Sequence, residues 1–182
     1  IEENGGRCDW DRGLAHAHNW NTLQRYGDCF RMVGTANTFQ PHKLHYDWNQ
    51  GRIHFLADTL WFQPSAHIDE MMMKTWKPVV VSTESSDPVL DITAKTDHGL
   101  KELTLYVANL GDHPREAVID LRGFNFKGKA EVQTIGGCEL TEYNTYDHKE
   151  NVVFQPSTAK FSRKGMRYTF PKYSYTIITL KK

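Results

Sequence analysis

The hydrophobic pattern of this chain changes near Lys77–Pro78, and this change constrains the fold more than any other feature. After Pro78, apolar and polar residues alternate with the period of two that is typical of β-strands. Before Lys77, apolar residues recur at helical spacing in two segments, and short extended segments separate them. We therefore divide the chain into residues 1–76 and residues 77–182.

Seven short strands are predicted downstream of this boundary, and turn residues such as Gly, Asp and Pro separate most of them. They cover residues 79–81, 90–94, 103–108, 117–121, 130–135, 166–170 and 175–180. Strands with this length and spacing are typical of an antiparallel sandwich or jelly roll. Their alternation predicts that one face of the sheet packs in a core and the other lies in water.

The upstream part predicts helices that alternate with strands. Its expected elements are a strand end at 1–3, a helix over 10–26, a strand over 29–34, a loop over 35–51, an extended segment over 53–56 and a helix over 66–76. Asp9 or Asp11 is expected to cap the first helix, and Ser65 the second. The order predicts the βα alternation of a parallel sheet or barrel. Such units should pack against the sandwich, be completed by another chain, or be poorly ordered.

The chain begins with an apolar residue, two carboxylates and a turn: Ile1-Glu2-Glu3-Asn4-Gly5-Gly6. Barrel enzymes place catalytic groups at the C-terminal ends of strands, so this pattern is that of a strand that reaches an active site. Side chains alternate along a strand, and Glu3 therefore shares a face with Ile1. A shift of one residue would select Glu2 instead, and two adjacent acids can also be merely solvated. We expect the chain to be the C-terminal portion of a larger protein.

Composition excludes several classes of function. The 22 basic and 22 acidic residues cancel, so no basic surface for nucleic acid is indicated. The longest apolar runs are too short to cross a bilayer. Three sparse cysteines fit free thiols in a reducing compartment, and no set of residues has the spacing of a metal site. The run Met71–Met73 is expected to pack in a core rather than form a ligand surface.

Segments along nearly the whole chain recur, in the same order, in one known family. They are Ile1–Gly5, Arg12–Ala17, Cys29–Val33, Thr35–Phe39, Gln63–His67, Leu103–Leu110, Ala117–Phe124, Tyr143–Val153 and Phe170–Leu180. Together they resemble the C-terminal part of the family 51 glycoside hydrolases, the α-L-arabinofuranosidases. The ordered set carries the resemblance, because no single motif in it is specific. The start of the chain also resembles the nucleophile segment of the family 1 β-glycosidases, but the strand and Trp-rich loop that follow there are absent.

The resemblance to family 51 implies a fold of class α/β plus all-β. Residues 1–76 would be the last βα units of a (β/α)8 barrel, and residues 77–182 an antiparallel jelly-roll or β-sandwich domain. It implies a retaining enzyme that hydrolyses terminal arabinofuranosyl groups from arabinose-containing poly- or oligosaccharides. Glu3 stands at the nucleophile, while the family's acid/base Glu lies upstream of this chain. Glu2 and Asn4 depart from the family pattern, so the register stays open to Glu2.

Two further residues are candidates for substrate binding. Asn37 follows a predicted strand, where its amide could bind a sugar hydroxyl or only satisfy a local turn. Trp48 could stack on a sugar ring, as could Trp61, although burial is the usual fate of Trp. Asn144 is expected to shape a loop of the sandwich.

The expected partners are an arabinofuranosyl-containing glycan and the rest of the catalytic barrel, with no nucleic acid and no membrane. No metal or organic cofactor is implied, and a homo-oligomer is left open. These 182 residues alone are expected to be inactive. The alternative hypothesis is a non-catalytic β-sandwich module that serves structure, assembly or glycan binding.

Overall fold

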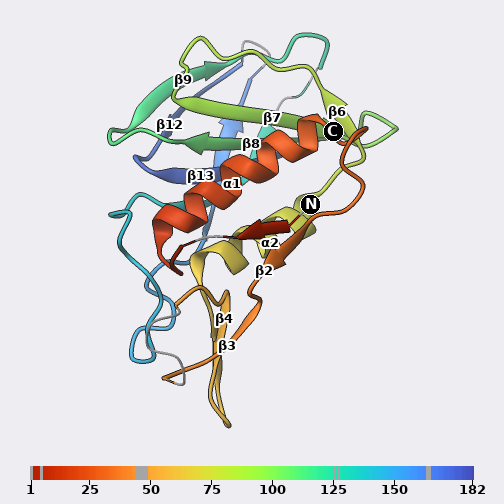
Figure 1. Cartoon of the computed structure of the whole chain (residues 1–182). Helices are drawn as coiled ribbons and strands as arrows, with labels where there is room; N and C mark the ends of the chain where they lie inside the picture. The colour runs from red at the N-terminus through yellow and green to blue at the C-terminus, as the bar shows by residue number, and fades with distance from the viewer. Residues whose placement is uncertain (1, 5, 44–48, 125, 127, 163–164) are drawn as a thin grey trace.

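The computed structural model describes residues 2–4, 6–43, 49–124, 126, 128–162 and 165–182, and gives residues 2–4 as backbone only. Most of the elements in these ranges are β-strands, and two helices, α1 (Trp10–Arg25) and α2 (Pro64–Thr75), accompany them. Figure 1 shows α1 lying along one face of the largest sheet, while a small second sheet lies beyond its other face.

The largest sheet is antiparallel and has six strands in the order β11-β10-β13-β8-β7-β6. In chain order these are β6 (Val79–Val81), β7 (Leu90–Thr96), β8 (Glu102–Asn109), β10 (Gly128–Gly136), β11 (Gln155–Phe161) and β13 (Ser174–Lys181). The second sheet pairs β9 (Arg115–Ile119) with β12 (Met166–Phe170), also antiparallel. All seven strands predicted downstream of Pro78 are present, with ends that differ by up to two residues.

The two sheets enclose one hydrophobic core. Leu103, Leu105 and Val107 alternate along β8 and point toward Met166 and Phe170 of β12 in the same buried cluster. The alternation follows from the pleat of the strand, which turns successive side chains to opposite faces.

The opposite face of the sheet is buried as well, so the prediction that it lies in water is wrong for the central strands. Tyr106 of β8 and Tyr175 and Ile177 of β13 belong to a second core with Trp10 of α1 and Met71 of α2. Both faces are covered because β8 and β13 carry apolar residues at odd and even positions alike. This core joins residues from both sides of the predicted boundary at residue 76, and the division into two domains stays a prediction.

The helices begin close to where the sequence predicts. Asp9 caps α1, and its carboxylate accepts a hydrogen bond from the Arg12 backbone N–H at 3.3 Å. For α2 the prediction of Ser65 as N-cap is wrong. The N-cap is Gln63, because Pro64 already occupies the first helical turn, where proline fits without losing a hydrogen bond.

Two small sheets complete the upstream part. The strand β1 (Glu2–Asn4) runs parallel to β2 (Gly34–Ala36), so β1, α1 and β2 form a βαβ unit. The strand β3 (Phe39–Pro41) is parallel to β4 (Ile53–Phe55), which pairs antiparallel with β5 (Leu60–Phe62).

The predicted strand over 29–34 is wrong, because β2 begins only at Gly34, and the predicted loop over 35–51 contains most of β2 and all of β3. The apolar run that suggested the earlier strand is on the surface, where Met32 is 81% exposed. The sequence also missed β5 and β11. The latter is an edge strand that contains Pro156 and is largely exposed, so it lacks the apolar alternation of the central strands.

Candidate functional site

The parallel pair β1–β2 defines the edge at which a functional site would lie. Glu2 is opposite Gly34, Glu3 opposite Thr35 and Asn4 opposite Ala36. Parallel strands end at the same edge of a sheet, and sites in α/β folds form beyond the carboxyl ends of such strands. The backbone of Glu3 therefore lies one residue before this edge.

Asn37 is the first residue after β2, so it leaves the strand pair at the same edge as the chain that follows Glu3. It is partly buried, and its backbone carbonyl accepts a hydrogen bond from the Arg52 N–H at 3.2 Å. The fold thus brings the chain around two of the predicted site residues together. The role of the Asn37 side chain stays a prediction, and Trp48 lies outside the described residues.

A cavity of about 390 Å³ opens beside this edge. Three separate parts of the chain line it: the segment after β1, the segment before β4 and the loop after β10. The lining residues are Gly6, Arg7, Cys8, Asp9, Asn49, Thr141 and Tyr143. This volume falls in the range of small-ligand sites, roughly 300–1,000 Å³.

Cys8 holds two of these parts together. Its thiol is 1% exposed and donates a hydrogen bond to Asn49 Oδ1 at 3.1 Å. Burial, with a smaller contribution from the charge of Asp9, raises the pKa of Cys8 to about 12. A thiol that stays protonated is a poor nucleophile and a poor metal ligand, so Cys8 is suited to shaping the cavity wall.

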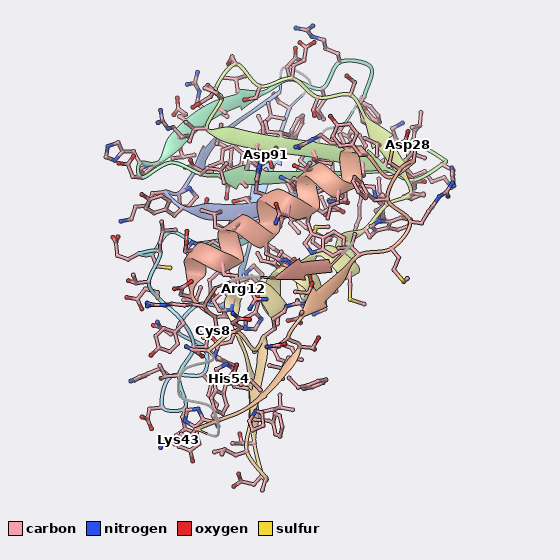
Figure 2. All side chains as sticks on the ribbon, in the orientation of Figure 1. Cys8, Arg12, Asp28, Lys43, His54 and Asp91 are labelled. Carbon is pink, nitrogen blue, oxygen red and sulfur yellow. The ribbon has the colours of Figure 1, made fainter. Side chains whose placement is uncertain are left out.

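Arg12, in the first turn of α1, ties the helix to the end of β2. Its guanidinium is buried and donates hydrogen bonds to the carbonyl oxygens of Ala36, at 2.7 Å, and Gln50. Figure 2 shows Cys8 and Arg12 where the chain enters α1, above the strands that carry His54. Arg12 therefore positions the segments on both sides of β3.

A second polar cluster joins α1, α2 and the segment just before β4. The Asp69 carboxylate contacts His16 Nε2 at 2.8 Å, accepts a hydrogen bond from Trp20 Nε1 at 2.8 Å and pairs with Arg52. Burial alone would raise the pKa of Asp69, but the contacts with His16 and Arg52 outweigh it and hold the pKa below its usual value. Both carboxylate oxygens are engaged in these contacts, so the cluster is structural.

Trp61 is buried and does not offer a stacking surface. It is 3% exposed, and its indole N–H donates to the backbone carbonyl of Asn144 at 3.1 Å. The rings of His42 and His54 lie at a steep angle to its ring, with centroid distances of 5.0 Å and 5.6 Å. Of the two alternatives for this Trp, the structure has the buried one.

The sequence did not single out Arg7, Asn49, Thr141 or Tyr143 as site residues. Thr141 and Tyr143 belong to the sandwich part, about 140 positions from β1, and no local pattern links them to it. Among the described residues, no group of His, Cys, Asp and Glu is arranged to hold a metal ion. No helix in the described ranges is long and apolar enough to span a membrane.

Comparisons with solved structures show the fold. The α-L-arabinofuranosidase of Thermotoga maritima, solved with arabinose, matches with a TM-score of 0.83 and 20% identity over 100% of this chain. A family 51 α-L-arabinofuranosidase of Bifidobacterium longum matches with a TM-score of 0.74 and 18% identity, again over 100% of this chain. A family 44 xyloglucanase of Paenibacillus polymyxa matches with a TM-score of 0.67 and 18% identity over 100% of this chain. Enzymes with different substrates thus share this fold.

This chain spans only part of those structures: 40% of the Thermotoga chain, 36% of the Bifidobacterium chain and 31% of the Paenibacillus chain. No curated protein matches the sequence. The family model for the alpha-L-arabinofuranosidase C-terminal domain matches residues 3–174. Because that match covers nearly all of its length, the chain belongs to the alpha-L-arabinofuranosidase C-terminal domain family.

Proposed function

We propose that this chain is the C-terminal portion of a retaining α-L-arabinofuranosidase that removes terminal arabinofuranosyl groups from arabinose-containing poly- or oligosaccharides. The observation that supports the proposal is the parallel pair β1–β2, in a chain of this family: the Glu3 backbone lies one residue before the carboxyl end of β1, and the segment that follows β1 lines a cavity. Residues 1–76 would be the last βα units of a (β/α)8 barrel. Residues 77–182 would be the attached jelly-roll domain.

In the proposed mechanism Glu3 is the nucleophile. Its carboxylate attacks the anomeric carbon and forms a glycosyl–enzyme ester, while the glycosidic C–O bond breaks. A second carboxyl group, supplied by the upstream part of the barrel, protonates the departing oxygen. The same group then takes a proton from water, which attacks the anomeric carbon and releases arabinose and the free Glu3 carboxylate. Two carboxyl groups and water complete this cycle.

A broad groove at the far end of α1 supports the presence of further barrel elements. Its volume is about 720 Å³, and Phe30, Met32 and Trp76 are among the residues that line it. Met32 is 81% exposed and Trp76 is 55% exposed. Asp28, labelled in Figure 2, marks this end of the molecule. Exposed apolar residues gathered in this way are typical of surfaces that another part of a protein covers.

The proposal is tested by Glu3→Gln in the complete polypeptide, with an aryl α-L-arabinofuranoside as substrate. Glutamine has nearly the shape of glutamate but cannot act as the nucleophile, so kcat should fall at least about 10³-fold. Glu2→Gln is the matched control and should keep kcat within a few-fold of the parent. If Glu2→Gln loses activity and Glu3→Gln keeps it, the register is shifted by one residue. If both variants stay active, or the parent is inactive, the proposed hydrolase is wrong.

A non-catalytic role in structure, assembly or glycan binding is the second candidate. The sharing of this fold with a family 44 xyloglucanase favours it, since a scaffold can accompany different chemistries. Binding of arabinan or arabinoxylan by the complete polypeptide, without release of arabinose, would select this candidate over the hydrolase.

A further inference from the structure

We propose that Tyr143 is an aromatic platform for the sugar residue next to the cleaved bond, and that Arg7, Asn49 and Thr141 bind the hydroxyl groups of that residue. The inference rests on the proposed function. It assigns a second sugar subsite to a loop of the sandwich part, between β10 and β11, which would thereby take part in substrate selection.

The lining of the 390 Å³ cavity fits an uncharged, hydroxyl-rich ligand. Among the residues that the structure describes, the lining includes one aromatic residue, Tyr143, and no aliphatic residue, so these residues offer little surface to an apolar ligand. Of the described lining residues, Arg7 and Asp9 carry opposite charges, so this part of the lining has no excess charge for an ion. Guanidinium, amide and hydroxyl groups bond hydroxyls as donors or acceptors, while a tyrosine ring offers an apolar face with a polar tip.

The loop that carries Tyr143 is fixed on its N-terminal side by α1. The backbone N–H groups of Trp10 and Asp11 donate to the carbonyl oxygens of Glu142 and Leu140, at 2.7 Å and 2.8 Å. The first turn of a helix leaves N–H groups without partners inside the helix, and here the loop supplies acceptors for two of them. The start of α1, which follows the catalytic strand, therefore sets the position of this loop.

On its C-terminal side the loop is fixed by Asn144, which is 1% exposed. The Asn144 side chain accepts a hydrogen bond from the Val152 N–H at 2.7 Å and donates one to the Phe62 carbonyl at 2.7 Å. Its own carbonyl accepts from Gln63 Nε2 at 2.8 Å. Both neighbours of Tyr143 are thus held in place.

Tyr143 itself is 42% exposed between these two fixed neighbours. Its ring adds little to the cores of the molecule, yet its backbone is immobilised before any ligand arrives. A ring on a backbone fixed in this way loses only the freedom of its own side chain on binding, which is the advantage of a pre-organised loop.

The cavity is also close enough to Glu3. Its wall starts at Gly6, three residues after Glu3, and three residues span at most about 11 Å. The cavity wall therefore begins within about 11 Å of the Glu3 backbone, which is close enough for an adjoining sugar residue to occupy the cavity in the proposed complex.

The test compares two substrates in the complete polypeptide. One is α-L-arabinofuranosyl fluoride, whose leaving group does not occupy the subsite, and the other is an arabinose-containing oligosaccharide, whose next sugar does. Tyr143→Ala should lower kcat/KM for the oligosaccharide about tenfold and change kcat/KM for the fluoride less than twofold. The tenfold loss corresponds to ~1.4 kcal/mol of binding free energy. Tyr143→Phe keeps the ring and should therefore retain most of the parent's kcat/KM for the oligosaccharide.

Tyr146→Ala is the matched control, because Tyr146 is 46% exposed on the same loop and does not line the cavity. It should leave the ratio of the two kcat/KM values unchanged. Equal losses on both substrates, or no loss on either, would overturn the subsite while leaving the hydrolase in place.

If the parent cleaves neither substrate, the proposed hydrolase fails and calorimetric titration decides the inference. Weaker binding of the oligosaccharide to Tyr143→Ala than to the parent and Tyr146→Ala supports the subsite. Equal binding by all three proteins, or no binding by any of them, refutes it.

Discussion

His54 on β4 is 5% exposed, and its ring lies near those of His42 and Trp61. Burial, helped by the charge of His42, lowers the pKa of His54 from 6.5 to about 4. Between these two values the unfolded chain binds a proton that the folded chain does not. The free energy of unfolding therefore falls as the pH falls from about 6.5 to about 4.

Replacing His54 should remove this contribution to the pH dependence. It amounts to up to about 3 kcal/mol, since one pKa unit corresponds to about 1.4 kcal/mol. We expect His54→Gln to unfold at lower urea concentration at pH 8, where the histidine is neutral in both states, and to lose less stability than the parent between pH 7 and pH 4.5. Urea titrations at several pH values measure both effects. Parallel stability curves for the two proteins would contradict the assignment.

The methionine run on α2 shows how far helical periodicity reaches at the scale of an element. Met71 is fully buried and Met72 is 5% exposed, whereas Met73 is 82% exposed. The prediction that this run packs in a core is confirmed for the first two residues. Met73 points away because successive residues on a helix are turned by about 100°.

This difference makes a matched pair of variants. Met71→Ala should lower the free energy of unfolding by about 2–5 kcal/mol, because it removes a side chain from the core between α2 and the sheet. Met73→Ala should change it by less than about 0.5 kcal/mol, as surface substitutions usually do. Chemical denaturation of both variants under identical conditions gives the comparison. Similar losses in the two would mean that α2 does not pack as described.

Elements were predictable from the sequence where a periodic apolar pattern met a clear end signal. Helix α1, with its Asp9 cap, and the central strands β8 and β13 are examples. The strand β2 was misplaced because its three residues are defined by pairing with β1, and pairing leaves no mark in local hydrophobicity. The strand edge near Glu3 was predictable, because strands that alternate with helices pair in parallel and end at the same edge of a sheet. Tyr143 could not be foreseen there, since only the packing of α1 against the loop after β10 brings it to that edge.

At the scale of the whole molecule, the central sheet is shared between the two parts of the chain. Trp10 of α1 is fully buried, and its indole N–H donates to the carbonyl of Tyr173 at 2.5 Å. Gly136 makes room for it: its φ is +96°, and a Cβ at this position would lie 2.5 Å from the Trp10 ring. The central sheet therefore packs closely against α1 at this point.

A polypeptide of residues 77–182 alone should consequently fail to fold into a soluble, cooperative unit. Removing the helices would uncover Tyr106, Ile135, Tyr175 and Ile177 on one face of the sheet, and a bare apolar face of this kind promotes aggregation. We expect residues 77–182 to be found in the insoluble fraction, or to bind a hydrophobic dye and unfold without a sharp transition, while the 182-residue chain unfolds more cooperatively under the same conditions. Size-exclusion chromatography and thermal unfolding would show the contrast. A monomeric, sharply unfolding product of residues 77–182 would instead establish the boundary at residue 76 as that of an independent domain, and the helices would then be an addition to a fold that is complete without them.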